Sequence, residues 1–133
     1  MATFPLKIMT PDGVAFEGEV VRVVCRTITG DLAILARHSD YCTALGMGDA
    51  HIVLEDGTTR HAACMGGMLS MMNGECHLLA TTFEWVEDID RERAVRAQHE
   101  AEERLKELKR GDEQFAIAEA KLKRAIARLR ATD

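Results

Sequence analysis

The sequence predicts a mainly β protein that carries a helical arm. Its expected fold is an N-terminal β-sandwich or flattened barrel followed by a C-terminal antiparallel two-helix hairpin. Short alternating apolar runs separated by turn signals fill the first part of the chain, which is typical of a sandwich or barrel. A charged, alanine-rich stretch with apolar residues every three or four positions follows at 88–130, as in paired helices. We therefore predict two domains, residues 1–84 and residues 85–133.

Composition and charge limit the classes of function. The 133 residues are 47% hydrophobic and carry a formal net charge of −5, which argues against a nucleic-acid partner. The longest nearly apolar run, Ala62 to Met72, is short and interrupted by Gly66 and Gly67, so we expect no direct insertion into a membrane. The N-terminus has no basic segment followed by an apolar one, so we do not expect export.

Alternating polarity defines the expected strands, because it places one set of side chains inward and the other toward water. The inward sets that we predict are Phe4, Leu6 and Ile8; Val21, Val23 and Cys25; Ile52 and Leu54; and Leu78 and Ala80. Proline fixes φ and glycine accepts positive φ in turns. The expected turns are Pro11-Asp12-Gly13, Asp56-Gly57 and Asn73-Gly74.

A glycine pair within the β part marks either a bulge or a close approach of two backbones. This pair, Gly66-Gly67, is flanked by Met65, Met68, Met71 and Met72. Methionine fills irregular gaps in cores and also forms adaptable contact surfaces. Both interpretations of these methionines stay open.

Candidate catalytic chemistry is weak in the β part. The scattered histidines His38, His51, His61 and His77 have no Ser, Cys or Asp at a spacing that marks a triad, so we interpret them as surface or strand histidines. Cys25, Cys42, Cys64 and Cys76 include no C-x-x-C pair. We expect reduced core thiols rather than a zinc site.

The expected arm has clear start and stop signals. Asp88 or Asp90 can cap the first helix, and Gly111 followed by Asp112 predicts a stop and a restart. An apolar stripe on each helix predicts a close antiparallel pair. The stripes are Ala94, Ala97, Ala101, Leu105 and Leu108, and then Phe115, Ala118, Leu122, Ala125 and Leu129. Because alanine dominates, we expect the two helices to hold one another weakly.

Basic residues gather near the end of the second helix. Lys121, Lys123, Arg124, Arg128 and Arg130 contain no acid between them. Such a run forms either a solvated face or a site for an acidic segment or a phosphate group. A closed hairpin would bring Arg124 and Arg128 toward Arg93 and Asp90, a combination of donors and acceptors suited to a nucleotide. No Walker-type glycine-rich loop is present, so we do not expect P-loop hydrolysis.

Nearly the whole chain resembles the epsilon subunit of bacterial F-type (rotary) ATP synthases. The resemblance lies in the order of four segments: TPDGVAFEGEV, GDLAIL followed by His38, GGMLSM, and EDIDRERA. It implies a non-catalytic central-stalk subunit of a proton-translocating synthase, at the cytoplasmic face of the membrane. The implied partners are the gamma stalk subunit, the membrane c-ring and, through an extended arm, the catalytic alpha and beta subunits. The arm is implied to restrain ATP hydrolysis.

The resemblance also implies a nucleotide site in the folded arm. Some members bind ATP through a motif of the form Ile/Leu-Asp-x-x-Arg-Ala, which stands here as Ile89-Asp90-Arg91-Glu92-Arg93-Ala94. The implied binding residues are Glu84, Asp90, Arg93, Arg124 and Arg128. No cofactor is required, and ATP is the implied regulatory ligand.

Two departures from the family accompany these matches. The family often has Gly-Ile-Leu-Pro-Gly-His where this chain has residues 33–38, Ala-Ile-Leu-Ala-Arg-His. Trp85 and Val86 stand beside Glu84, where a tryptophan is expected to stack on a base or to block it.

Two other functions compete with the rotor role. One is a free-standing adaptor or chaperone-like module that presents a helical hairpin, and the other is an enzyme built on the sandwich, for which no nucleophile–base pair was found.

Overall fold

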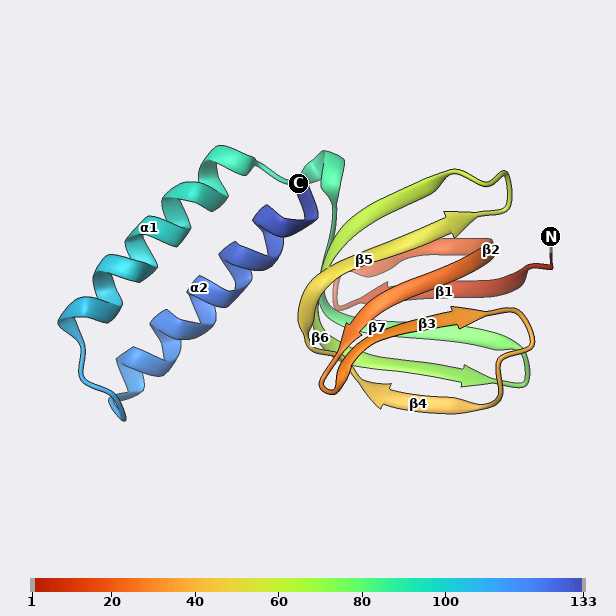
Figure 1. Cartoon of the computed structure of the whole chain (residues 1–133), viewed down its shortest axis with the longest axis horizontal. Helices are drawn as coiled ribbons and strands as arrows, with labels where there is room; N and C mark the ends of the chain where they lie inside the picture. The colour runs from red at the N-terminus through yellow and green to blue at the C-terminus, as the bar shows by residue number, and fades with distance from the viewer. Residues whose placement is uncertain (1, 133) are drawn as a thin grey trace.

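The chain forms a β-sandwich with a two-helix arm at one end. The computed structural model describes residues 2–132 (Figure 1). Within them, seven strands precede a short 3₁₀ helix and two α-helices. These elements are β1 Phe4–Thr10, β2 Gly13–Thr27, β3 Gly30–Leu35, β4 Tyr41–Ala44, β5 Met47–Leu54, β6 Thr59–Met72, β7 Glu75–Trp85, η1 Val86–Asp88, α1 Arg91–Glu107 and α2 Glu113–Thr132. The predicted fold class is confirmed.

The strands close on themselves as a flattened barrel. Their order is β1-β7-β6-β5-β2-β3, β4 pairs with β6, and β1 pairs with β2 as well as with β7. Only the β1–β7 pair is parallel among these pairings. Since β1 closes the ring through both neighbours, few strand edges stay open to another chain.

The core lies between the two layers and follows most of the predicted alternation. Phe4, Leu6 and Ile8 are buried, as are Leu78 and Ala80. Val21 departs from the prediction, because the β2–β5 register shifts between Val20 and Arg22 and leaves Val21 only half-buried. Val20 and Val23 fill the inward positions instead. A register shift of this kind reverses which side chains face inward.

The cysteines and methionines divide between core and surface. Cys25, Cys64 and Cys76 are free and buried, as predicted, but Cys42 on the short strand β4 is exposed. The expectation of a core thiol is therefore wrong for Cys42. Two of the four methionines, Met65 and Met71, are buried, whereas Met68 and Met72 are about half exposed.

At the glycine pair, the backbones of β6 and β7 approach each other closely. Gly66 and Gly67 have φ of 70° and 103°. A Cβ at Gly67 would lie 1.8 Å from the carbonyl oxygen of Leu79 on β7. The register of β6 on β7 does not shift between Met65 and Gly67. Of the two predicted features, the glycine pair is therefore a close approach of two backbones and not a bulge. Glycine is required because β6 and β7 touch here.

The predicted caps begin both helices. Asp90 accepts a hydrogen bond from the Arg93 backbone N–H at 3.1 Å, and Asp112 accepts one from the Gln114 backbone N–H at 3.0 Å. Gly111 has a φ of 90° in the turn between the helices. Side-chain carboxylates satisfy the free N–H groups of a helix start.

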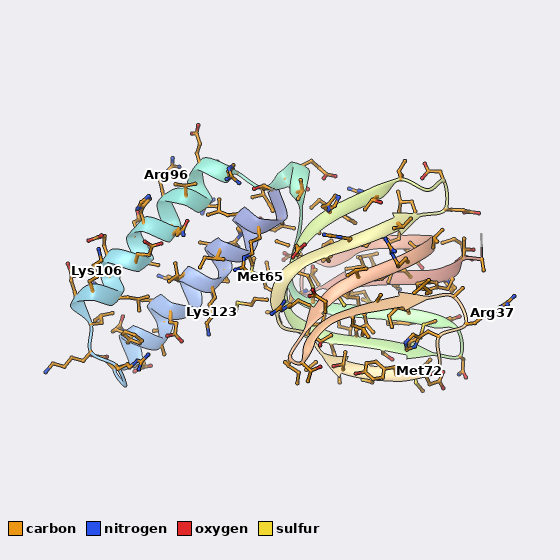
Figure 2. All side chains as sticks on the ribbon, in the orientation of Figure 1. Arg37, Met65, Met72, Arg96, Lys106 and Lys123 are labelled. Carbon is orange, nitrogen blue, oxygen red and sulfur yellow. The ribbon has the colours of Figure 1, made fainter. Side chains whose placement is uncertain are left out.

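Helix α2 lies between α1 and the sandwich (Figure 1). One of its stripes, which includes Ala118 and Ala125, is buried in the hairpin as predicted. A second stripe, Ala127 and Ala131, packs with Ala63 and Met65 of β6. Met65 extends from the sandwich toward α2 in Figure 2. No pattern in the sequence predicted this second stripe, which holds the arm in its folded position.

Candidate functional site

An ion pair joins the end of the sandwich to the arm. Glu84 lies near the end of β7, and its Oε1 accepts a hydrogen bond from Nε of Arg128 on α2 at 2.6 Å. The two side chains are 31% and 29% exposed. Charge-assisted bonds of this length are strong, and partial burial reduces the screening by water. Glu84 points outward because its neighbour Trp85 faces the sandwich interior.

The start of α1 lies opposite this ion pair, across a cleft. Asp90 is its N-cap and Arg93 follows in the first turn. Arg91, in the same turn, donates to the Leu129 carbonyl and to the Thr132 hydroxyl at the end of α2. These bonds draw the two ends of the hairpin together and thereby set the width of the space between Arg93 and Arg128.

A cleft of 310 Å³ opens between these elements. Its lining residues come from β7, η1, α1 and α2, and they are Glu84, Asp88, Asp90, Arg93, Ala94, Ala97 and Arg128. Four of the five implied site residues therefore meet in one place. Asp88 is an additional lining residue, for which the sequence predicted only a possible role as a helix cap.

Arg124 lies one helical turn away and lines an adjoining groove. This groove, of 410 Å³, runs between α1 and α2 and includes Ala97, Glu100, Arg104, Lys121, Arg124 and Arg128. Arg128 and Ala97 line both spaces. The cleft is thus rich in carboxylates, while cations predominate in the groove. Arg104 was not singled out in the sequence, because only folding of the hairpin places it opposite Lys121 and Arg124.

Trp85 does not line the cleft. It contacts Phe16 and Phe83 edge-on, with ring centroids 6.2 and 4.9 Å apart. The guanidinium of Arg60 lies 3.6 Å from the centre of the Trp85 ring, and Arg60 also donates to Glu87 of η1 at 2.6 Å. We call Arg60, Trp85 and Glu87 the hinge clamp. Hydrogen bonding from Arg60 holds the pKa of Glu87 below its ordinary value. The expectation that Trp85 stacks on a base or blocks the site is wrong for this arrangement.

The rest of the described chain offers little catalytic chemistry. Among residues 2–132, no three His, Cys, Asp or Glu side chains form a cluster able to enclose a metal ion. Burial raises the pKa of Cys25 to about 11 and the pKa of Cys64 and Cys76 to about 12, so these thiols are poor nucleophiles. Neither α1 nor α2 is sufficiently long and apolar to cross a membrane.

Known proteins resemble the chain along its whole length. The model of the ATP synthase delta/epsilon chain β-sandwich domain matches residues 3–86, and that of the long α-helix domain matches residues 87–133. An ATP synthase epsilon chain of Caldicellulosiruptor bescii is 38% identical over 130 residues, which is 98% of this chain and 93% of the relative. An epsilon chain of Exiguobacterium is 37% identical over 133 residues, which is 100% of this chain and 98% of that one.

A solved structure supports the same fold. A chain of the Euglena gracilis mitochondrial ATP synthase, determined as an OSCP/F1/c-ring assembly, superposes with a TM-score of 0.84. The sequence identity is 22%, and the match covers 96% of this chain and 79% of that one. The resemblance noted in the sequence is confirmed by the domain models and the bacterial relatives. The chain belongs to the delta/epsilon chain family of ATP synthases.

Proposed function

We propose that the chain is a non-catalytic central-stalk subunit of a bacterial ATP synthase that couples the stalk to the membrane ring and regulates ATP hydrolysis through its arm. The observation that carries the proposal is the full-length match to bacterial epsilon chains together with a sandwich and hairpin in one chain. The proposed partners are the gamma subunit, the c-ring and, for the extended arm, the alpha and beta subunits. Its proposed location is the cytoplasmic face of the membrane, without insertion.

An exposed apolar row on the sandwich supports attachment to another subunit. Cross-strand pairing aligns one residue from each of five neighbouring strands, and directly opposed residues share a face. The row consists of Ala44, Met68, Leu79, Met9 and Val14. Met68 and Leu79 are each 49% exposed and Val14 is 53% exposed. A contiguous apolar row on a soluble surface is typical of a docking face, and we assign it to the stalk subunit.

The thin contact between α2 and the sandwich supports a movable arm. Four buried side chains carry its apolar part, namely Ala63, Met65, Ala127 and Ala131. Each buried methyl group contributes only about 0.8 kcal/mol. The Glu84–Arg128 ion pair adds a polar latch that a charged ligand or partner can replace. A weakly docked element with a replaceable latch is suited to two positions.

The chemistry of the cleft and groove supports ATP as the regulatory ligand. Carboxylates at Glu84, Asp88 and Asp90 can accept hydrogen bonds from the amino and hydroxyl groups of adenosine. Guanidinium groups at Arg93, Arg128 and Arg124 match the fork geometry of phosphate oxygens. The nucleoside would then occupy the cleft, and the phosphates would extend toward the groove.

A thermal-shift titration tests the nucleotide site. Millimolar ATP should raise the unfolding midpoint of the isolated chain by several degrees, because ligand binding to the native state stabilises it. Arg93→Ala should abolish the rise, since a lost charge-assisted contact to phosphate costs about 1.5–3 kcal/mol. Arg96→Ala is the matched control, because Arg96 is an exposed arginine on the same helix outside the cleft (Figure 2). Equal midpoints with and without ATP would reject the nucleotide role and leave the stalk role standing.

Binding to the catalytic complex separates the stalk role from a free-standing adaptor. A complex purified without this subunit should bind the chain and hydrolyse ATP more slowly once it is bound. Met68→Glu places a charge in the apolar row and should weaken that binding. Ile28→Glu is the control, because Ile28 is 70% exposed on the sandwich outside that row, and it should leave the binding unchanged. No binding at all would favour the adaptor.

A further inference from the structure

Two histidines face each other on the outer surface of the sandwich. His51 on β5 and His61 on β6 are direct partners in the antiparallel register. Their ring centroids are 4.5 Å apart, and the ring planes make an angle of 67°. Nothing in the proposed stalk role uses this pair, which lies outside both the cleft and the groove.

We propose that His51 and His61 form a two-histidine site for a divalent transition-metal ion, with preference for Cu²⁺ and Ni²⁺ over Zn²⁺. Imidazole nitrogen is a common ligand of these ions, and affinity at nitrogen sites is highest for Cu²⁺. With metal–nitrogen bonds of about 2.0–2.1 Å, two imidazole centres that share an ion would be roughly 4.5–5.2 Å apart. The shorter end of that range corresponds to an N–metal–N angle near 90°, as in tetragonal sites. The observed separation fits that end.

Asp49 adds a feature that is typical of metal-binding histidines. Its Oδ2 lies 2.8 Å from Nε2 of His51. A carboxylate on one ring nitrogen fixes the tautomer that donates there and leaves the lone pair on the other nitrogen. In His51 that lone pair is on Nδ1, which is therefore the donor atom for the ion. The same contact orients the ring.

Exposure and backbone geometry complete the site. The His51 side chain is 39% exposed and Asp49 is 44% exposed, and His61 is exposed as well. Because the site offers two imidazoles, water molecules would fill the remaining coordination positions. Residues 2–132 hold no group of three His, Cys, Asp or Glu side chains placed to bind a metal ion. An ion held there would tie β5 to β6 two residues from Ala63, against which α2 packs.

His77 provides a matched control within the same sandwich. It lies 3.7 Å from the carboxylate of Glu75, two residues earlier, just as His51 has Asp49 two residues earlier. Its cross-strand partners, however, are Ser70 on β6 and Lys7 on β1, and neither is a histidine. His77 thus has the carboxylate and the exposure of His51 but lacks a second imidazole.

Calorimetric titration of the untagged full chain with NiCl₂, and separately with ZnCl₂, in a buffer that does not bind metals tests the site. We expect one Ni²⁺ site per chain and weaker binding of Zn²⁺. His61→Gln and His51→Gln should each weaken the Ni²⁺ site by at least about tenfold, and Asp49→Asn by about tenfold through loss of the carboxylate behind His51. His77→Gln should leave it unchanged.

The outcomes decide the proposal without reference to any other subunit. All of the substituted side chains are exposed or half-exposed, and metal-free melting curves of the variants verify that they fold. An equal loss in His77→Gln and His61→Gln would mean general surface binding and would overturn the site. Unchanged Ni²⁺ affinity in His61→Gln, or no saturable binding to the unsubstituted chain, would overturn it as well.

Discussion

The cysteines of the sandwich differ in burial, and burial raises the pKa of their thiols. Cys25, Cys64 and Cys76 are buried and Cys42 is exposed. Desolvation is the main reason that the pKa of Cys64 is about 12 against an ordinary 9.0, with the nearby Cys25 as the second cause. The neutral thiol is therefore the only form that the folded core accommodates at moderate pH. The unfolded chain has no such restriction.

Stability should fall with rising pH above about 9 because of these thiols. A raised folded-state pKa means that the stabilisation is complete below pH 9.0 and is lost as the pH rises toward 11–12. Each thiol contributes a slope of about 1.4 kcal/mol per pH unit in that window. Urea unfolding at pH 8, 9 and 10 should therefore show a shallower decline for Cys64→Ala than for the unsubstituted chain. Cys42→Ala is the control and should keep the full decline; equal slopes for the two variants would contradict this account.

Arg37 has a backbone conformation that its residue type does not indicate. It stands where the family often has the second glycine of Gly-Ile-Leu-Pro-Gly-His, and its φ is 66°. The left-handed backbone conformation suited to that glycine is thus present with an arginine in it. A side chain in this region costs about 1–2 kcal/mol. The sequence could not predict this geometry, because an arginine carries no preference for positive φ and only the closed turn before β4 imposes it.

At the scale of elements, β6 and β7 approach most closely at Gly67, where a side chain has no room. Gly67→Ala would place its Cβ 1.8 Å from the Leu79 carbonyl oxygen and 2.8 Å from the Ala80 Cα, both of which are backbone atoms. We expect a loss of about 3 kcal/mol or more in the free energy of unfolding, because overpacking and a positive φ act together. Denaturant unfolding measures it.

Gly74 supplies the control for that substitution. It also has a positive φ, of 81°, but a Cβ added there would meet nothing within 4 Å. Gly74→Ala should cost only about 1 kcal/mol, from the backbone conformation alone. Similar losses in the two variants would show that β6 and β7 do not require the close approach.

The hinge clamp holds the end of β7 and η1 to the sandwich. Arg60→Ala should expose the only tryptophan of the chain, Trp85, to water and shift its fluorescence emission to longer wavelength. The lost stacking of Arg60 on the ring should lower stability by about 0.5–1 kcal/mol. Arg22→Ala, at another exposed arginine, should change neither quantity. An unchanged emission spectrum in Arg60→Ala would refute the clamp.

The helical elements show where sequence patterns stop being informative. The caps Asp90 and Asp112 and the buried hairpin alanines could be predicted, because their signals are local or periodic. The docking stripe of Ala127 and Ala131 could not be, because alanines on a charged helix resemble ordinary surface residues. Only their tertiary partners on β6, Ala63 and Met65, reveal their role.

At the scale of the whole molecule, the sandwich and the arm make different contributions. The larger core draws only on residues from Phe4 to Trp85, so the sandwich has the means to fold without the arm. The cleft, in contrast, needs β7, η1 and both helices together. The position of the cleft could be predicted from the sequence, because an antiparallel hairpin brings Arg128 near Asp90 and Arg93. The separation of carboxylates in the cleft from cations in the groove could not be predicted, because it depends on how the folded arm packs.

The most direct test of a regulatory arm is the ATP hydrolysis rate of a catalytic complex that lacks this subunit. The complex is assayed alone, with the full chain, and with residues 1–88, which keep the sandwich and the hinge clamp. We predict that both forms bind, that the full chain lowers the rate, and that residues 1–88 leave it at the level of the complex alone. Equal inhibition by the two forms, or no inhibition by the bound full chain, would contradict a regulatory role for the arm.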